Sequence, residues 1–253
     1  MDTAAALSAF DQQLRRELPP GDSATAVERE PRLTRHVSTV AHSWQGVVWT
    51  DLDESSADAA IAAELSRFTG DYEWKLYSHD QPADLADRLL AAGLVADELE
   101  AVMVAEAAEV PDFGPPAGVD IIDATTPEGI VKATDLHERV FGKDMGRLRA
   151  QLLAAAPGTL DVVLAVADGE VVCAARTDYY PGTDFAGLWG GGTLEEWRGK
   201  GVYKAVVSHR ARRAQARGVR YLQVDALPTS EPILRRAGFS KLTTTRPFTA
   251  RPR

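Results

Sequence analysis

The sequence predicts a mixed α/β protein built from two domains. Its 253 residues are enough for one large domain or two small ones, each with a real core. Segments that alternate as strands do are interleaved with segments of helical period. Between them, Val110–Gly118 holds three prolines and two glycines, which is a linker composition. We therefore expect domains at residues 1–110 and 119–253, joined by residues 111–118.

The first half predicts alternating helices and strands. Leu7, Phe10 and Leu14 recur at helical spacing and predict an amphipathic helix within residues 1–18. The later elements are strand material over residues 33–51 with apolar Val37, Val40, Val47, Val48 and Trp49, a helix capped by Asp53–Ser56 that ends near Gly70, a strand at Tyr72–Tyr77, a helix at Ala83–Ala92 that stops at Gly93, and a strand at Leu99–Ala105.

The second half continues the same alternation. Ala167–Glu170 carries the Asp-Gly signal of a hairpin turn between two apolar strands. In chain order the elements are a strand at Val119–Ile122, helices at Pro127–Phe141 and Met145–Ala155, strands at Leu160–Ala167, Val171–Tyr180 and Phe185–Leu194, a helix with Tyr203, Val207, Ala211 and Ala214 along one side, a strand at Arg220–Ala226, a helix at Glu231–Arg236 and an extended tail.

The net charge of −9 is divided unevenly along the chain. Residues 1–116 carry 8 Lys+Arg against 22 Asp+Glu, a net −14, whereas residues 117–253 carry 20 against 15, a net +5. The acidic half argues against nucleic-acid binding, and the basic half suits a small polyanionic ligand. No apolar run approaches the ~20 residues that span a bilayer, and Met1-Asp2-Thr3 lacks a signal-peptide pattern, so we expect a cytoplasmic protein without membrane contact.

Cysteine and histidine usage excludes two kinds of site. The single cysteine, Cys173, forms no internal disulfide, and its apolar neighbours predict a buried strand thiol rather than a nucleophile. The chain has five histidines, and none is spaced as a metal ligand on one face. The sequence therefore predicts no metal site.

The glycine-rich segment before position 202 is the stretch that predicts a specific chemistry. An apolar strand with Gly190, Gly191 and Gly192 leads into a turn with Gly199 and Gly201, and a helix follows. The unpaired N–H groups at a helix start attract an anion such as a pyrophosphate. The three strand glycines are compatible with a bulge, and equally with close packing.

Three phosphate-binding patterns compete at this turn. A Walker A loop requires Ser or Thr after Gly-Lys, but Gly201 follows Lys200; a dinucleotide fingerprint requires a third glycine where Lys204 stands. Arg198–Tyr203 instead resembles the R/Q-x-x-G-x-G/A loop of the GNAT N-acetyltransferase superfamily. Ile233–Phe239 is similar to that superfamily's closing helix and Gly-Phe turn.

The two halves also resemble each other. Ala86–Leu94 parallels Pro232–Phe239, but the first half has Asp51–Ser55 where the second has its glycine turn. Carboxylates there would repel a phosphate. We therefore expect a GNAT-like fold in the C-terminal domain and a partial, degenerate GNAT-like N-terminal domain, a tandem arrangement known in this superfamily.

The resemblance implies acetyl-CoA, or another acyl-CoA, as co-substrate and transfer of its acyl group to a primary amine. The acidic first half suggests a cationic small-molecule or peptide acceptor. By position in the family motif, backbone groups of Gly191, Gly192 and Thr193 hold the pantetheine arm. The pyrophosphate is held by Arg198, Gly199, Lys200, Gly201, Val202, Tyr203 and Lys204.

The chain departs from the family pattern at two positions. Tyr203 stands where a small residue is expected, and it either turns onto the apolar side of its helix or crowds the phosphates. Leu234 replaces a frequent tyrosine that protonates the departing thiolate. A coenzyme A thiol has a pKa near ~8.5, so an acid helps departure without being essential.

Several side chains are candidates for proton transfer. Asp225 lies on the strand that flanks the acyl group in the family; it is a base, or it is structural or positions the substrate. Tyr179 and Tyr180 are candidate acids or edge aromatics. Ser230 caps the last helix or contacts pantetheine. The alternative to an acetyltransferase is a non-catalytic acyl-CoA-binding or regulatory protein, which Leu234 motivates.

Overall fold

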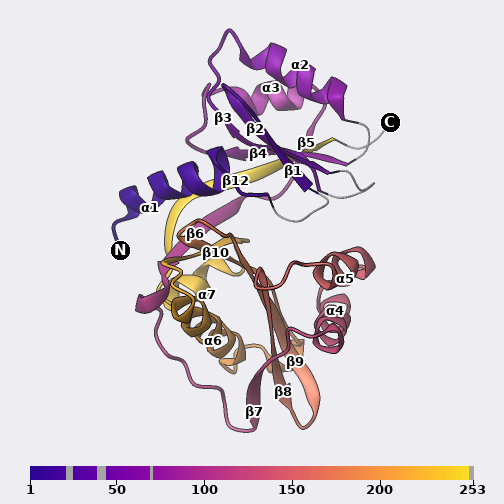
Figure 1. The fold of residues 1–253 in the computed structure, drawn as a ribbon, viewed down its shortest axis with the longest axis vertical. Helices are drawn as coiled ribbons and strands as arrows, with labels where there is room; N and C mark the ends of the chain where they lie inside the picture. Colours follow the sequence, from indigo (N-terminus) through magenta and orange to yellow (C-terminus); the bar gives the residue numbers. More distant parts are fainter. Residues whose placement is uncertain (21–24, 39–43, 69–70, 251–253) are drawn as a thin grey trace. The chain divides into compact units, whose positions relative to one another are not determined.

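The computed structural model describes residues 1–20, 25–38, 44–68 and 71–250 (Figure 1). The chain forms two compact units. The first unit comprises Met1–Met103, Asp225–Glu231 and Lys241–Arg253, and the second comprises Val104–Val224 and Pro232–Ser240.

In the first unit, strands β1 to β4 pair in chain order. The pairs β1–β2 and β2–β3 are antiparallel, β3–β4 is parallel, and β12 pairs antiparallel with both β4 and the short β5. The elements are α1 (Thr3–Phe10), the π-helical turn η1 (Asp11–Arg16), β1 (Thr25–Glu30), β2 (Leu33–Ser38), β3 (Gly46–Thr50), α2 (Ala57–Arg67), β4 (Tyr72–Tyr77), α3 (Leu85–Ala91), β5 (Val95–Ala96), β6 (Glu100–Glu106, which continues into the second unit) and β12 (Ser240–Ala250).

In the second unit, the strands are hydrogen-bonded in the order β7-β8-β9-β10-β11. The first three pairs are antiparallel and β10–β11 is parallel. The elements are the 3₁₀ turn η2 (Ala107–Glu109), β7 (Val119–Asp123), α4 (Pro127–Phe141), α5 (Gly146–Leu153), β8 (Leu160–Ala167), β9 (Glu170–Tyr179), β10 (Phe185–Thr193), the 3₁₀ turn η3 (Glu195–Trp197), α6 (Val202–Ala216), β11 (Tyr221–Ala226) and α7 (Glu231–Arg236).

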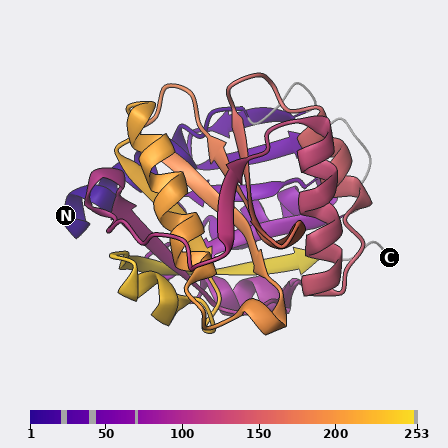
Figure 2. The same ribbon diagram turned by 90° about the horizontal axis from the view of Figure 1, so that it is seen from below.

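The second unit has helices on both faces of its strands. Figures 1 and 2 show α6 on one side of β8–β10 and α4 with α5 on the other. The strands are therefore apolar on both faces, which explains the continuous apolar run of β8. The buried core includes Ile130 and Leu136 of α4, Leu164 of β8, and Val202 and Val206 of α6.

The first unit buries its core on one face of β4. Tyr72 and Trp74 point into a cluster with Leu85 and Leu89 of α3. The alternate residue Tyr77 contacts Phe10 of α1, with ring centroids 5.7 Å apart. The alternation predicted for residues 72–77 is thus confirmed, and it separates an α2/α3 side from an α1 side.

Helix α4 shows why some boundaries were predictable. Thr126 accepts the Gly129 N–H at 3.1 Å as an N-cap, Pro127 opens the helix, and Gly142 ends it with a left-handed φ of +65°. These are local signals, and the predicted helix at Pro127–Phe141 is confirmed. The predicted helix within residues 1–18 is confirmed as α1, but it continues as a π-helical turn rather than as an α-helix.

The C-terminal strand belongs to the first unit. Residues Thr245–Ala250 of β12 pair with Tyr77–Tyr72 of β4, so the units differ in composition from the predicted ranges 1–110 and 119–253. The sequence predicts only an extended tail for this segment. Strand pairing between residues so far apart leaves no local pattern that would reveal it.

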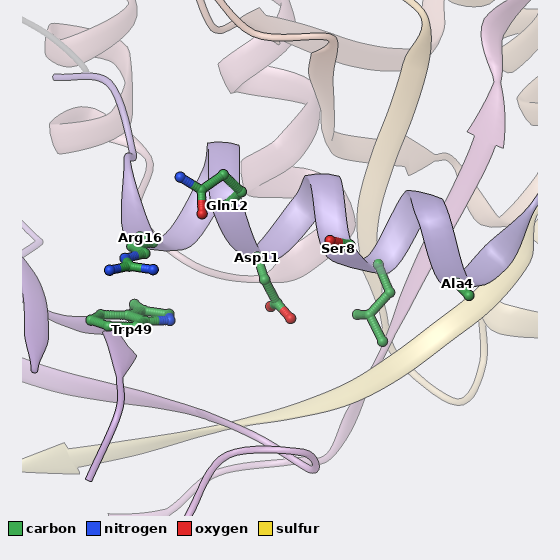
Figure 3. Close-up of a pocket in the computed structure, with 7 residues that line it drawn as sticks. Ala4, Ser8, Asp11, Gln12, Arg16 and Trp49 are labelled. Atoms are coloured by element: carbon green, nitrogen blue, oxygen red, sulfur yellow. The ribbon is translucent and has the colours of Figure 1, made fainter.

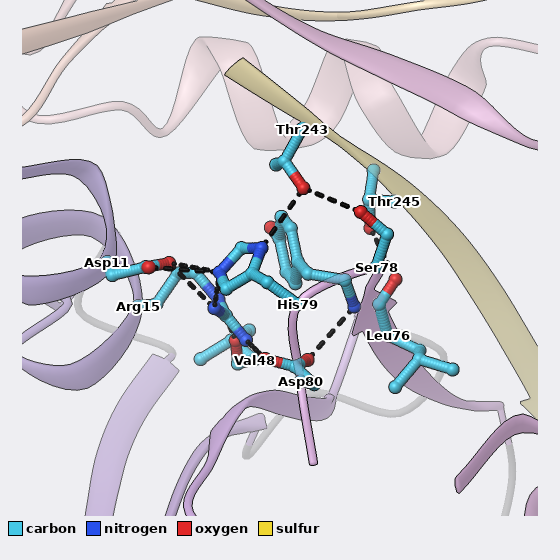
Figure 4. A network of polar contacts seen from close by, with 10 residues as sticks. Asp11, Arg15, Val48, Leu76, Ser78, His79, Asp80, Thr243 and Thr245 are labelled. Atoms are coloured by element: carbon cyan, nitrogen blue, oxygen red, sulfur yellow. Dashed lines mark hydrogen bonds and ion pairs between the residues drawn. The ribbon is translucent and has the colours of Figure 1, made fainter. Parts of the chain in front are cut away.

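Polar contacts also join β12 to the N-terminal helix (Figure 4). The buried Arg15 guanidinium donates to Asp80 Oδ1 at 2.6 Å and to the Val48 carbonyl at 3.0 Å. His79 Nδ1 lies 3.0 Å from Thr243 Oγ1 of β12, and its Nε2 lies 2.9 Å from Asp11. The C-terminal strand is therefore held by side chains as well as by its backbone.

The linker predicted at residues 111–118 is irregular but bonded to the second unit. Ser208 of α6 donates to the Pro111 carbonyl at 2.8 Å and accepts the Phe113 N–H at 2.9 Å. Lys204 lies over the Phe113 ring at 5.3 Å. This segment thus packs along α6.

Some expectations fall on residues that the structure does not describe, namely strand position Val40 and the helix end near Gly70. Within the described ranges, no helix combines the length and apolarity that a bilayer span requires.

Candidate functional site

The three consecutive glycines of β10 make a bulge and also admit close packing. The register with β9 shifts between Trp189 and Gly192, and Gly190 has a left-handed φ of +60°. A Cβ at Gly191 would lie 2.5 Å from the Tyr203 ring, and one at Gly190 would lie 3.0 Å from His137. Both readings of the glycines therefore hold: α6 and α4 approach β10 from opposite faces of a bulged strand.

Strand β10 separates from β11 beyond this point. Its parallel pairing with β11 covers Phe185–Gly187 opposite Tyr221–Gln223, whereas its pairing with β9 continues to Thr193. The bulged part of β10 thus has β9 along one edge, and its pairing with β11 has ended. Main-chain groups along such an edge can pair with an extended ligand as a strand would.

The turn after β10 leaves the start of α6 open. Gly199 and Gly201 have φ of +75° and +89°, and a Cβ at either would meet nothing within 4 Å. Gly201 is the N-cap residue, and no side chain in the described ranges caps this helix. The first turn also contains no acidic residue. The amide N–H groups at this end are consequently suited to bind an anion.

Basic side chains surround the open helix start. Arg198 Nε donates to the Thr193 carbonyl at 3.1 Å, so this residue ties the turn to the end of β10. Lys200 Nζ lies 4.8 Å from the Trp197 ring centroid, and Lys204 follows in the first turn of α6. Val202 is fully buried, so its side chain packs into the core beneath the turn.

Tyr203 lies on the apolar side of its helix, and it also covers the bulge. Its ring packs against the second unit's core and against Gly191. Burial raises the pKa of its hydroxyl, although the positive charge of Arg210 acts in the opposite direction. Of the two positions expected for this side chain, the apolar side of α6 is the one observed.

The two candidate tyrosines have different environments. Tyr179 donates its hydroxyl to buried Asp161 at 2.8 Å, and Arg217 lies 4.1 Å above its ring; burial and this carboxylate raise the pKa of Tyr179. Tyr180 instead accepts the Trp189 indole N–H at 3.2 Å. Since Trp189 begins the bulge, Tyr180 is the tyrosine that lies beside it.

Asp225 and Ser230 fall in the first unit, unlike the other predicted site residues. Asp225 forms a buried ion pair with Lys75. Burial alone would lower the pKa of Lys75, but the Asp225 carboxylate outweighs it and holds this pKa well above its usual range. Ser230 donates to the Leu227 carbonyl at 3.1 Å, within its own turn. Leu234 is completely buried, so it adds no proton donor.

Two polar residues of β9 near the bulge, Arg176 and Asp178, were not among the predicted site residues. Asp178 accepts from Arg176 Nε at 3.2 Å, and burial raises the pKa of this carboxyl. It is the strand partner of Gly187. The signal was present in the alternation of Val171–Tyr180, which places Arg176 and Asp178 on the same strand face as Tyr180.

His137 on α4 also lies against the bulged strand, as a packed helical histidine. Its side chain is 2% exposed, and neither ring nitrogen has a hydrogen-bond partner among the described residues. Burial lowers its pKa, and the charge of Arg176 adds to this effect. The neutral imidazole is therefore the form that the fold favours.

A pH titration of stability tests this environment. An unfolded histidine binds a proton near pH 6.5, whereas folded His137 binds it only at lower pH. The contribution of His137 to stability is therefore complete above pH 6.5 and declines as the pH falls toward its folded pKa, by at most about 1.4 kcal/mol per pH unit. We expect His137→Gln to flatten urea-unfolding free energies between neutral and mildly acidic pH. Equal slopes for wild type and His137→Gln would contradict the assignment.

The turn that precedes α2 in the first unit is closed by a carboxylate of the chain. Asp53 Oδ1 accepts the N–H groups of Ser55 and Ser56, each at 3.0 Å, and Arg32 pairs with the same carboxylate. The Ser55 hydrogen bond, followed by the Arg32 contact, holds the pKa of Asp53 well below its usual range. The turn before α2 thus carries a carboxylate and no glycine, whereas the turn before α6 carries Gly199 and Gly201 and no carboxylate after Glu196.

The first unit also contains an open pocket of about 470 Å³ (Figure 3). It lies along α1 and η1, and Arg16 lies over the Trp49 ring at 5.1 Å. Its lining residues are Ala4, Leu7, Ser8, Asp11, Gln12, Arg16 and Trp49, none of which was predicted to bind a cofactor. No group of side chains in the described part of the chain is arranged to hold a metal ion.

Comparison of sequences yields no matching family model and no matching curated protein. Solved structures do match. A GCN5-related N-acetyltransferase from Kribbella flavida aligns with 98% of this chain and 93% of its own at 15% identity and a TM-score of 0.71. One from Sphaerobacter thermophilus aligns over 88% and 77% at 15% identity, with a TM-score of 0.63. A tandem GNAT protein from the clavulanic acid biosynthesis pathway aligns over 90% and 84% at 15% identity, with a TM-score of 0.59. The chain therefore has the GNAT fold, in an α+β arrangement matched over nearly its full length by structures that include a tandem GNAT protein.

Proposed function

We propose that the protein is an N-acetyltransferase that transfers the acyl group of acetyl-CoA to a primary amine. The observation that carries this proposal is the open, side-chain-free start of α6 directly after a bulged strand. The amide groups from Gly199 to Lys204 would bind the pyrophosphate. The backbone of Gly191, Gly192 and Thr193 would pair with the pantetheine arm along the edge of β10. The side chains that cover the two faces of this strand would therefore not obstruct the arm.

The chemistry requires little from side chains. The amine attacks the thioester carbon, its lone pair forming the C–N bond as the carbonyl oxygen becomes an oxyanion. The nitrogen then loses a proton to solvent, and collapse of the tetrahedral intermediate breaks the C–S bond and expels the coenzyme A thiolate. Main-chain N–H groups at the β10 bulge would stabilise the negative oxygen of that intermediate. Because Leu234 is buried and apolar, the thiolate departs without help from that position; its pKa near ~8.5 makes this departure feasible at neutral pH.

The three predicted proton-transfer residues, Tyr179, Tyr180 and Asp225, differ in their contacts. Tyr180, beside Trp189 at the bulge, is the acid that the contacts favour. Tyr179 is engaged with Asp161, and Asp225 with Lys75. Because Lys75 already engages the Asp225 carboxylate, for Asp225 we favour substrate positioning over proton abstraction. The net charge of −14 on residues 1–116 supports a cationic acceptor.

Buried Leu234 favours the second candidate, a regulatory protein that binds acyl-CoA without turnover. Incubation of the purified chain with acetyl-CoA and a panel of primary amines separates the two. We expect coenzyme A release, measured with a thiol reagent, together with an acetylated amine identified by mass spectrometry. Burial raises the pKa of the Cys173 thiol to about 11, so the protein itself should add little to the signal. Coenzyme A binding without product across a broad panel would favour the regulatory protein.

A further inference from the structure

Two arginines of α6 and the arginine that follows it as C-cap face the strands of the second unit. Two of them share a counter-ion: Arg213 Nε donates to Asp161 Oδ2 at 2.8 Å, and Arg217 Nη2 donates to Asp161 Oδ1 at 2.6 Å. The third, Arg210, is the most buried, with 1% of its surface exposed. The described part of the chain offers Arg210 no ion pair.

The guanidinium of Arg210 is only partly satisfied. Its Nη1 donates to the Arg176 carbonyl at 3.0 Å, and the hydroxyl of Tyr203 lies near enough to act electrostatically on the guanidinium. Its Nε and Nη2 have no hydrogen-bond partner among the described residues, and neither does the fully buried Thr177 Oγ1 on the adjacent residue of β9. Burial lowers the pKa of Arg210, as expected for a cation without a counter-ion. Leaving such donors unpaired is costly, and natural structures rarely do so.

The contacts of Arg210 place it beneath the bulge of β10. Arg176, whose carbonyl it binds, is the strand partner of Trp189, where the bulge begins. Tyr203, its other partner, lies against Gly191. Tyr203 and Arg210 share one side of α6, seven residues apart. A ligand whose phosphates bind at the start of α6 and whose reactive end lies at the bulge would therefore reach Arg210 with an extended acyl tail.

We propose that Arg210 and Thr177 form a subsite for a carboxylate carried by the substrate, and that this carboxylate is the terminal group of a dicarboxylic acyl chain on coenzyme A. The inference rests on the proposed function and narrows its donor. The carboxylate would supply the missing counter-ion of Arg210 and accept from its Nε, Nη2 and the Thr177 hydroxyl. Tyr203, which is partly exposed, covers this subsite and would turn away from Gly191 when the acyl chain enters. A carboxylate on the acceptor amine has the same chemistry and is the second source to test.

Succinyl-CoA and butyryl-CoA have acyl chains of equal length and differ at the tip, carboxylate against methyl. We expect the wild-type protein to bind and turn over succinyl-CoA roughly 10- to 100-fold better than butyryl-CoA, the range expected for a charged hydrogen-bonded pair. Arg210→Met should abolish this discrimination, and Thr177→Val should reduce it severalfold. Arg213→Met removes an arginine of the same helix face whose counter-ion is Asp161, so it should retain the wild-type ratio.

The acceptor arm compares alanine with ethylamine, which lacks the carboxylate. If the protein preferred alanine over ethylamine and Arg210→Met removed this preference, the subsite would be supported and the carboxylate would belong to the acceptor. Circular dichroism checks folding, and Thr177→Val supplies the test if Arg210→Met does not fold. The subsite would be overturned if calorimetry gave equal affinities for succinyl-CoA and butyryl-CoA and the acceptor carboxylate had no effect. If acetyl-CoA were still turned over, the proposed function would stand. Buried water would then satisfy Arg210. If no acyl-CoA bound, both the subsite and the proposed function would be overturned. If acyl-CoA bound without turnover, the enzymatic function would be overturned, and the ratio of succinyl-CoA to butyryl-CoA affinity would still test the subsite.

Discussion

Replacing Gly201 by valine is expected to weaken coenzyme A binding by roughly 10- to 100-fold, the loss of one or two charge-assisted hydrogen bonds. Gly201 has a φ of +89°, a conformation that a β-branched residue strongly disfavours. The turn would have to change, and the amide groups at the start of α6 would no longer converge on one point. Isothermal titration calorimetry with coenzyme A measures the effect directly.

Gly218 provides a matched control at the other end of α6. It has a φ of +78° and open space at its Cβ position, as Gly201 does. Gly218→Val should therefore destabilise the fold about as much as Gly201→Val, but it should leave coenzyme A affinity within about twofold of wild type. Equal losses of affinity in both variants would show that the effect comes from general destabilisation, and the phosphate-binding role of the turn would be wrong.

Arg15→Met is expected to destabilise the first unit by about 3–5 kcal/mol. Arg15 is 1% exposed and is the counter-ion of Asp80, whose side chain is 4% exposed, at 2.6 Å. Removing the cation leaves a buried carboxylate uncompensated and deprives the Val48 carbonyl of a donor. Urea unfolding followed by the fluorescence of the chain's tryptophans measures the change.

An exposed ion pair of the same unit serves as the comparison. Arg32 contacts Asp53 at 2.7 Å, but both side chains are about half exposed. Because solvent screens such a pair, Arg32→Met should cost less than about 1 kcal/mol. If Arg15→Met costs no more than Arg32→Met, the buried network of Figure 4 does not hold the first unit together as described.

The elements that could be predicted from the sequence are those whose signals are local. The cap at Thr126, the left-handed glycine at 142 and the alternation over Tyr72–Tyr77 each act over a few residues. The turn at Gly199 and Gly201 followed by an amphipathic helix is equally local, so the candidate phosphate-binding segment could be located without a structure. The GNAT fold followed from the same segment and its spacing to Gly238.

Contacts between distant residues could not be predicted in this way. The pairing of β12 with β4 places Thr245 opposite Tyr77. Asp225, a candidate base, is paired with Lys75, which is 150 residues away in the sequence. Tyr179 and Tyr180 are adjacent in sequence, yet one contacts Asp161 and the other Trp189.

The sequence by itself determined the order of the helices and strands and the open helix start at Gly201, because backbone preferences and caps are properties of neighbouring residues. Only the tertiary structure decided that Asp225 is paired with Lys75 and that Arg210 is buried without a carboxylate. The physical reason is that desolvation and charge pairing depend on which groups the fold brings together, and these groups lie on elements far apart in the chain.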